Sequence, residues 1–192
     1  MTRFFWLRHG PTHQKVFTGW RDVPADLSDI GLIARMAALL PADAPVVSSD
    51  LRRARDTADA LAGPRRRLPD QPALREMHFG DWDGLPFPEI ARRDPALSRA
   101  YWETPGDIAA PGGESWNDTS ARVETAVQSL AADHHGGAVV IVAHLGVILT
   151  QVARATGRSP EQTIGQSIEP LSLTEIVIDG PRRQLIRVNH LG

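Results

Sequence analysis

The segment Ala138–Ala143 constrains the fold of this chain more than any other part of the sequence. It reads Ala-Val-Val-Ile-Val-Ala and contains no polar side chain. A half-buried strand alternates apolar and polar residues, whereas an unbroken β-branched run is typical of a strand buried on both faces. Such strands lie in the middle of parallel sheets that helices cover on either side. The sequence therefore predicts an α/β fold.

The rest of the chain alternates between further strand-like and helix-like segments. Strands are predicted over Phe4–Leu7, Ala44–Ser48, Ser172–Ile178 and Gln184–Asn189, the last two joined by a turn at Asp179-Gly180-Pro181. Helices are predicted over Asp29–Leu40 with Ser28 as N-cap, Leu51–Leu61, Glu89–Arg99, Trp116–Ala132 with a Ser115/Asp118 capping box, and Val147–Thr156.

These elements predict a three-layer α/β/α sandwich with a mostly parallel central sheet, forming a single domain over residues 1–192. Residues 69–111 are less periodic and richer in proline, tryptophan and charge. We expect them to form a small excursion over the functional site.

Composition excludes several classes of site. The chain has no cysteine, which excludes disulfides, thiolate metal sites and cysteine nucleophiles. Arginine-rich runs at residues 52–55 and 65–67 resemble a nucleic-acid footprint, but the net charge of −2 opposes a polyanion. The apolar stretch Ala138–Leu149 is broken by His144 and Gly146 and is too short for a bilayer span, and no signal peptide is apparent. We expect no nucleic-acid or membrane partner, and a cytoplasmic location.

Polar side chains follow three of the predicted strands. Arg8-His9-Gly10 follows the first strand, Ser48-Ser49-Asp50 the second, and His144-Leu145-Gly146 the strand at Ala138–Ala143. Ligands bind outside the carboxyl ends of the strands in an open α/β sheet. Either histidine alone is readily explained as a hydrogen-bonded core residue. Together with Arg8 and with Arg53, one turn into the next helix, they predict a pocket of two imidazoles and two guanidiniums, which suits a phosphate dianion.

This chemistry favours phosphoryl transfer through a histidine. Without cysteine, a neutral imidazole is the available nucleophile, and it can attack phosphorus when cations hold the other oxygens. The departing alkoxide needs a proton, and Glu76 is the candidate acid because it lies where the excursion leaves the core. From the residues alone, a pocket that only binds a phosphorylated ligand stays open as an alternative.

Four motifs occur along the chain: Leu7–Thr12 with Arg-His-Gly, Ser49–Ala58, Leu74–Gly84, and Val142–His144. In this order they resemble the histidine phosphatase superfamily, also called the phosphoglycerate mutase-like family, over nearly the whole chain. The resemblance implies that His9 becomes phosphorylated, that Arg8, Arg53 and His144 hold the phosphoryl oxygens, and that Glu76 is the general acid and base. It also implies a small-molecule phosphomonoester as substrate, with no metal and no other cofactor.

Several residues depart from that family's pattern. Lys15 stands where the family often has asparagine, Asp50 replaces the usual proline of the second motif, and Leu145 replaces a glycine. These changes affect the fit of the substrate and remove no catalytic group. We expect five residues to contact the substrate, with Trp102 as a further candidate for an aromatic wall: Lys15, Thr18, Gly19, Trp20 and Trp82.

Other functions compete with a phosphatase. Phe17–Asp22 resembles the segment with which phosphoglycerate mutases hold the substrate's carboxylate, but mutases are usually longer, and Phe79–Gly84 resembles the phosphatase form of its motif. Asp81-Trp82-Asp83-Gly84 superficially matches Mg²⁺-dependent phosphatases with an aspartate nucleophile, although a poor strand precedes it. A non-catalytic protein that binds phosphorylated ligands is the third alternative. A strand edge near Ser172–Ile178 offers a surface for a homodimer.

Overall fold

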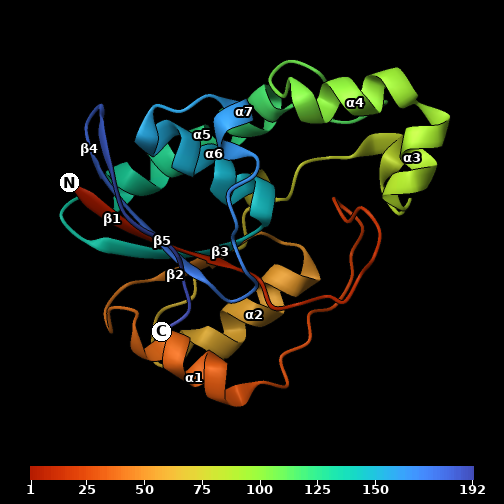
Figure 1. Cartoon of the computed structure of the whole chain (residues 1–192). Helices are drawn as coiled ribbons and strands as arrows, with labels where there is room; N and C mark the ends of the chain where they lie inside the picture. The colour runs from red at the N-terminus through yellow and green to blue at the C-terminus, as the bar shows by residue number, and fades with distance from the viewer.

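The computed structural model describes residues 1–192, and its centre is a five-stranded sheet in the order β2-β3-β1-β4-β5. The strands are β1 (Thr2–Arg8), β2 (Val46–Ser48), β3 (Ala138–Ala143), β4 (Leu173–Asp179) and β5 (Arg182–His190). One face is covered by α1 (Ile30–Ala38) and α2 (Arg52–Ala62), and the other by α5 (Trp116–Asp133) and α6 (Leu145–Thr156) (Figure 1). The three-layer α/β/α arrangement expected from the sequence is confirmed.

The sheet is only partly parallel. β3 pairs in parallel with β1 and β2, whereas β4 pairs antiparallel with both β1 and β5. The expectation of a mostly parallel sheet therefore holds for one half and is wrong for the other. β4 and β5 form a hairpin at Gly180, whose φ of 57° suits a tight turn. Because β5 covers the outer side of β4, the free edge expected near Ser172–Ile178 does not exist, and β5 is the edge strand.

Alternate residues of the central strands divide the core into two halves. On β1, Phe4 and Trp6 pack with α5 and α6, while Phe5 and Leu7 pack with α1 and α2. The side chains of β3 divide in the same way, and every residue from Val139 to Ala143 is fully buried. Burial on both faces is what the unbroken apolar run predicted.

The starts of α5 and α1 show how well local signals locate a helix. The capping box expected from Ser115 and Asp118 is present at α5. At α1 the cap is Asp29 and not Ser28, because the Asp29 carboxylate accepts the Leu32 N–H at 2.8 Å. The helix therefore begins one residue later than expected, at Ile30.

Helix α6 begins directly after β3. It starts at Leu145, two residues before the expected start, so that His144 is its N-cap residue. Gly157, in the left-handed conformation, ends it as the sequence predicted. A short helix that was not predicted, α7 (Pro160–Thr163), follows. No helix in the protein combines the length and apolar character that a membrane span needs.

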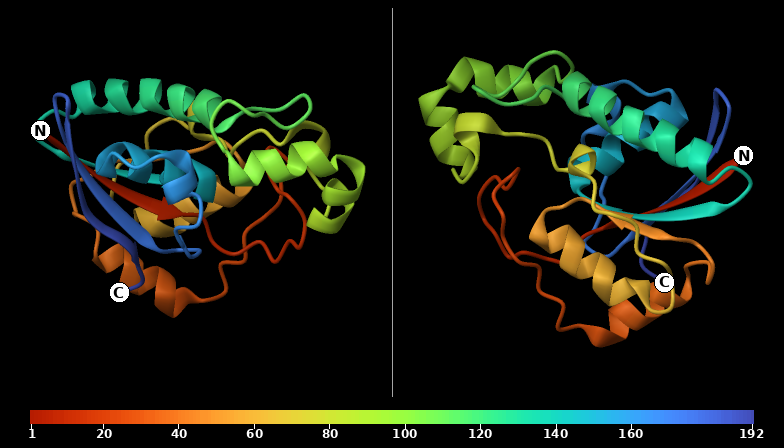
Figure 2. Two further views of the ribbon diagram at one scale, coloured as in Figure 1. Left: turned by 45° about the horizontal axis from the view of Figure 1, so that its top comes forward. Right: turned by 180° about the vertical axis from the view of Figure 1, so that it is seen from behind.

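Residues 69–111 form an excursion from the sheet (Figure 2). It contains two 3₁₀ turns, η1 (Pro72–Leu74) and η2 (Gly80–Trp82), and two helices, α3 (Phe87–Arg93) and α4 (Pro95–Glu103). The single helix expected over Glu89–Arg99 is broken because Pro95 cannot continue α3 and starts α4 instead. Both helices extend past the carboxyl ends of β1 and β3, beside the loop of residues 9–29 (Figures 1 and 2).

The segment that leads into the excursion and the segment that leads out of it lie in close backbone contact. The Glu114 N–H donates to the His78 carbonyl at 2.8 Å. A Cβ on Gly80 would collide with the Pro111 carbonyl, and a Cβ on Gly113 would collide with that of His78. Only glycine allows the two backbones to approach this closely.

Candidate active site

Four charged or titratable side chains meet at the carboxyl ends of β1 and β3. Arg8 ends β1 and His9 follows it, Arg53 lies in the first turn of α2, and His144 caps α6. The ring centroids of His9 and His144 are 5.1 Å apart, and Arg53 Nε donates to His9 Nε2 at 3.2 Å. The side chains of His9, Arg53 and His144 are buried. The structure thus brings together the two imidazoles and two guanidiniums that the strand ends predicted.

A backbone contact orients the His9 ring. Its Nδ1 lies 2.7 Å from the Gly10 carbonyl oxygen, so this nitrogen carries the proton and donates. Nε2 is then left with its lone pair. Gly10 is itself fixed, because its N–H donates to Thr57 Oγ1 at 3.0 Å and a Cβ there would lie 2.7 Å from Leu27 Cδ2. The fold therefore sets the tautomer that can attack an electrophile through Nε2.

The guanidiniums of Arg8 and Arg53 are held by carbonyl oxygens and not by carboxylates. Arg53 donates to Gly19 O at 2.7 Å, and Arg8 donates to Ile168 O at 2.6 Å. Burial lowers the pKa of both side chains. Arg8 Nε and both ring nitrogens of His144 are buried with no hydrogen-bond partner. A buried cation, a half-buried one and unpartnered polar atoms beside them indicate a site for an anion.

Glu76 brings a carboxyl group to the same site from the loop after η1. Its Oε1 accepts the N–H groups of Met77 at 3.0 Å and Gly146 at 3.1 Å. Burial raises the pKa of the Glu76 carboxyl, and these N–H groups together with Arg53 oppose the shift only in part. A carboxylic acid with a raised pKa can donate a proton at neutral pH.

Gly146→Ala is expected to disable Glu76 without altering any reacting group. The added Cβ would lie 2.6 Å from Glu76 Oε1 and 2.8 Å from Met77 Sδ, so the carboxyl must move. A positioned acid contributes about 10²–10⁴-fold, so for the phosphomonoester hydrolysis expected from the sequence we predict that kcat for an alkyl phosphate falls about tenfold or more. Gly165→Ala is the matched control, since nothing lies within 4 Å of a Cβ there. An unchanged kcat in Gly146→Ala would show that the contact has no catalytic role.

The His9 imidazole should remain neutral well below the ordinary pH for histidine. Burial, and after it the charge of Arg53, lower the pKa of His9 from 6.5 to about 3. In an imidazole ¹⁵N NMR titration from pH 8 to pH 4, assigned with His9→Ala, we expect no protonation step at this ring. The unfolded chain binds this proton near pH 6.5, so the ring's contribution to stability falls as pH drops from about 6.5 toward 3. A midpoint near 6.5 would contradict the buried environment.

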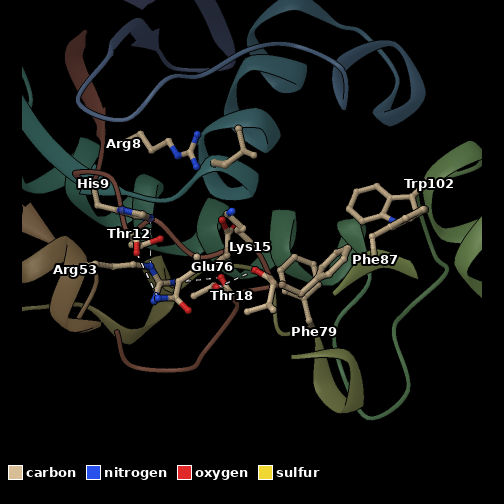
Figure 3. A pocket seen from close by; sticks show the side chains of 14 residues that line it. Arg8, His9, Thr12, Lys15, Thr18, Arg53, Glu76, Phe79, Phe87 and Trp102 are labelled. Atoms are coloured by element: carbon tan, nitrogen blue, oxygen red, sulfur yellow. Dashed lines mark hydrogen bonds between the residues drawn. The ribbon is translucent and has the colours of Figure 1, made fainter. Parts of the chain in front are cut away.

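The site opens into a cavity of about 340 Å³. Arg8, His9, Arg53 and Glu76 line it (Figure 3). Fully buried beside the His9 ring, His144 is not part of the cavity wall. Three residues expected to meet the substrate line the cavity, namely Lys15, Thr18 and Trp102. Sequence reasoning missed three phenylalanines in the wall, for which the chain gives no local signal: Phe17, Phe79 and Phe87.

Three other residues expected to contact the substrate, Gly19, Trp20 and Trp82, do not line the cavity. Trp82 is fully buried in the core and donates to Asp94 Oδ2 at 2.8 Å. Trp20 donates through Nε1 to the Glu76 backbone carbonyl at 2.7 Å, and Gly19 offers its carbonyl to Arg53. Trp20 therefore holds the backbone of Glu76, and Gly19 holds the guanidinium of Arg53, although neither residue lines the cavity.

The two aspartates of the segment at residues 81–84 have structural partners. Asp81 is exposed and pairs with Arg93 at 3.5 Å. The Asp83 carboxylate accepts three backbone N–H groups at 2.9 to 3.1 Å, those of Gly19, Trp20 and Arg21. Neither carboxylate lines the cavity, so the geometry does not support an aspartate nucleophile. Sequence reasoning also missed what Asp83 does, which is to fix the loop that carries Phe17 and Thr18.

The departures from the family pattern have separate structural outcomes. Asp50 binds Arg75 through two hydrogen bonds of 2.8 and 2.6 Å, which lower the pKa of its carboxyl, and it does not line the cavity. Its charge is therefore compensated. Leu145 lines the cavity and adds apolar surface, and the Lys15 ammonium lines it without an ion-pair partner.

Proteins of known sequence or structure resemble almost the whole chain. The family model for the histidine phosphatase superfamily (branch 1) matches residues 4–191. A bifunctional protein of Mycobacterium tuberculosis is 34% identical over 93% of this chain and 51% of its own length, so the chain spans about half of that relative. The glucosyl-3-phosphoglycerate phosphatase of the same organism is 39% identical over 76% of this chain and 71% of its own. The solved structure of Bacillus stearothermophilus YhfR has a TM-score of 0.91 at 29% identity, covering 100% of this chain and 98% of that one.

Proposed function

Because this chain belongs to branch 1 of the histidine phosphatase superfamily, we propose that it hydrolyses a small phosphomonoester through a phosphohistidine on His9. One observation carries the proposal: His9 Nε2 faces the buried guanidinium of Arg53, the half-buried Arg8 lines the same cavity, and carbonyl oxygens hold both guanidiniums. A phosphoryl group supplies the negative charge that this site lacks. The phosphatase among the relatives supports hydrolysis as the reaction. In this proposal residues 1–192 act as a single domain.

In the first step, His9 Nε2 forms a bond to phosphorus while the bond from phosphorus to the ester oxygen breaks. Protonated Glu76 gives its proton to the departing oxygen, so that a neutral alcohol leaves. Arg8 and Arg53, with His144 beside His9, stabilise the charge on the three remaining phosphoryl oxygens. The Gly10 carbonyl that accepts the Nδ1 proton stabilises the positive charge of the phosphorylated ring.

In the second step, water replaces the alcohol. Glu76, now ionised, removes a proton from the water molecule while the water oxygen attacks phosphorus. The bond between phosphorus and His9 Nε2 breaks, inorganic phosphate forms, and the proton on Glu76 restores the starting state. Each group thus serves both halves of the reaction, and the positive charge comes from side chains that the fold already holds in place.

The geometry favours hydrolysis over transfer within phosphoglycerates. The segment Phe17–Asp22 resembles the one with which mutases hold the substrate's carboxylate, an anion that a cationic side chain would bind. Arg21 in that segment packs over Gly84, where a Cβ would lie 3.1 Å from its guanidinium, and it does not line the cavity. The segment therefore supplies no cation to the cavity, whose wall holds, apart from the two phosphoryl-site arginines, one exposed cationic side chain, Lys15.

Phosphate release from a panel of phosphomonoesters in excess EDTA tests the proposal. We expect full activity with and without the chelator, and inorganic phosphate in place of 2-phosphoglycerate when 3-phosphoglycerate is the substrate. Loss of activity in EDTA would indicate a metal-dependent enzyme. Tight phosphate binding without turnover on any ester would indicate a binding protein.

A further inference from the structure

The cavity has two chemically different ends (Figure 3). Arg8, His9 and Arg53 lie at one end, and Phe79, Phe87 and Trp102 lie at the other, with Lys15 between them. An ester whose phosphoryl group reaches His9 therefore directs its alcohol portion toward aromatic rings. The aromatic end can therefore select among alcohols, independently of how the phosphoryl group is bound.

The aromatic end is already assembled in the protein without ligand. The Phe17 ring packs edge-on against Phe79 with centroids 5.1 Å apart, and it lies 5.7 Å from the Trp102 ring. Trp102 in turn packs against Tyr101, which contacts the buried Trp82. Three separate parts of the chain therefore form one rigid surface that needs little reordering when a ligand binds.

Phe87 completes this surface from the first turn of α3. Its side chain is 53% exposed, although a large apolar side chain gains free energy when it is buried. It lines the cavity together with Val16 and Phe17 from the loop of residues 9–29. A ligand with an apolar body would cover this ring, whereas a polar alcohol would leave it in contact with water.

Polar groups that could select a charged or sugar-like alcohol are scarce at this end. The Thr18 hydroxyl donates to the Val16 carbonyl at 3.1 Å, and the Gln14 amide donates to the Thr12 carbonyl at 3.4 Å. Lys15 is exposed, and an exposed point charge contributes little binding free energy. An alcohol rich in hydroxyl or carboxylate groups would lose its hydration here and regain few hydrogen bonds.

We propose that the cavity selects phosphomonoesters whose alcohol portion is a bulky apolar group of aromatic character, seated against Phe17, Phe79, Phe87 and Trp102. The inference rests on the proposed phosphatase function and adds the substrate class. Discrimination in such a pocket is about 10- to 200-fold for small differences in apolar contact. The preference should therefore be visible between two esters of equal chemical reactivity.

The test compares 3-phenylpropyl phosphate with glycerol 3-phosphate, which both release a primary alcohol. We expect kcat/KM to be about tenfold or more higher for the phenylpropyl ester, and Phe87→Ala to reduce this ratio severalfold. Ile30→Ala, which removes a 76%-exposed apolar side chain from α1, is the matched control and should leave the ratio unchanged. Equal values for the two esters, or a ratio that Phe87→Ala does not alter, would overturn the proposal.

Binding of two phosphonates that cannot be hydrolysed separates this inference from the proposed function. Calorimetry should show 3-phenylpropylphosphonate binding about tenfold or more tightly than methylphosphonate. If this preference is present and no ester is hydrolysed, the proposed phosphatase function fails and the apolar pocket stands. If esters are hydrolysed and the phosphonates bind equally, the pocket assignment fails and the phosphatase stands.

Discussion

His9→Ala lowers kcat for phosphate release by about 10⁴-fold or more, since removal of a nucleophile eliminates the covalent route. The reaction depends on the lone pair at Nε2, which no other group in the cavity can replace at that position. Rapid quenching of the wild-type protein with a ³²P-labelled ester should trap acid-labile label on His9, and His9→Ala should carry none. The variant should still unfold cooperatively, because the Arg53 guanidinium loses His9 as an acceptor but keeps its hydrogen bonds to the Arg21 and Gly19 carbonyls.

His13→Ala is the control for this experiment. His13 is exposed, pairs with Asp26 at 2.9 Å and does not line the cavity, so its loss should change kcat less than twofold. Label that persists in His9→Ala, or turnover within tenfold of wild type, would place the phosphoryl transfer elsewhere.

Glu76→Gln should affect the first step according to how much the leaving group needs a proton. For an alkyl phosphate we expect the phosphorylation rate to fall about 10²–10⁴-fold, the usual contribution of general acid catalysis. For p-nitrophenyl phosphate the rate should change little, because nitrophenolate leaves without protonation. Glutamine keeps an oxygen that accepts the Met77 and Gly146 N–H groups, so the side chain stays in place.

Pre-steady-state kinetics give the measurement. Since Glu76 also activates water, the variant should break down its phosphohistidine slowly and release a burst of nitrophenol close to one equivalent. Glu161→Gln, on the exposed surface of α7, is the control and should behave as wild type. Equal losses in the first step for both esters would mean that Glu76 is not the acid.

Much of the catalytic end of the site was visible in the sequence because it depends on local patterns. The apolar run of β3 reveals a strand buried on both faces, and the residue after such a strand lies at the ligand-binding edge of the sheet. His9 and His144 could therefore be placed near each other before any contact was known. The antiparallel pairing of β4 with β1 could not be predicted, because the alternation of apolar and polar side chains along a strand does not reveal the direction of the neighbouring strand.

The substrate end of the cavity was much less accessible to sequence reasoning. Its rings come from the loop after β1, the residue before η2, the start of α3 and the end of α4, and only tertiary packing brings them together. No sequence pattern distinguishes Trp82 from Trp102, yet Trp82 is buried in the core and Trp102 lines the cavity. Gly146 gave no signal either, since the need for glycine arises from the close approach of Glu76.

The backbones at Gly80 and Gly113 lie against each other, so the chain between them leaves and rejoins the rest of the protein at one point. The reactive carboxyl of Glu76 lies before this point, while Phe87 and Trp102 lie within the enclosed stretch. Changes in the length or composition of α3 and α4 can therefore alter which alcohol is accepted without moving the proton donor. The architecture keeps every reacting group outside the enclosed stretch and places Phe87 and Trp102 within it, so that this part of the aromatic surface can be engineered without altering the catalytic groups.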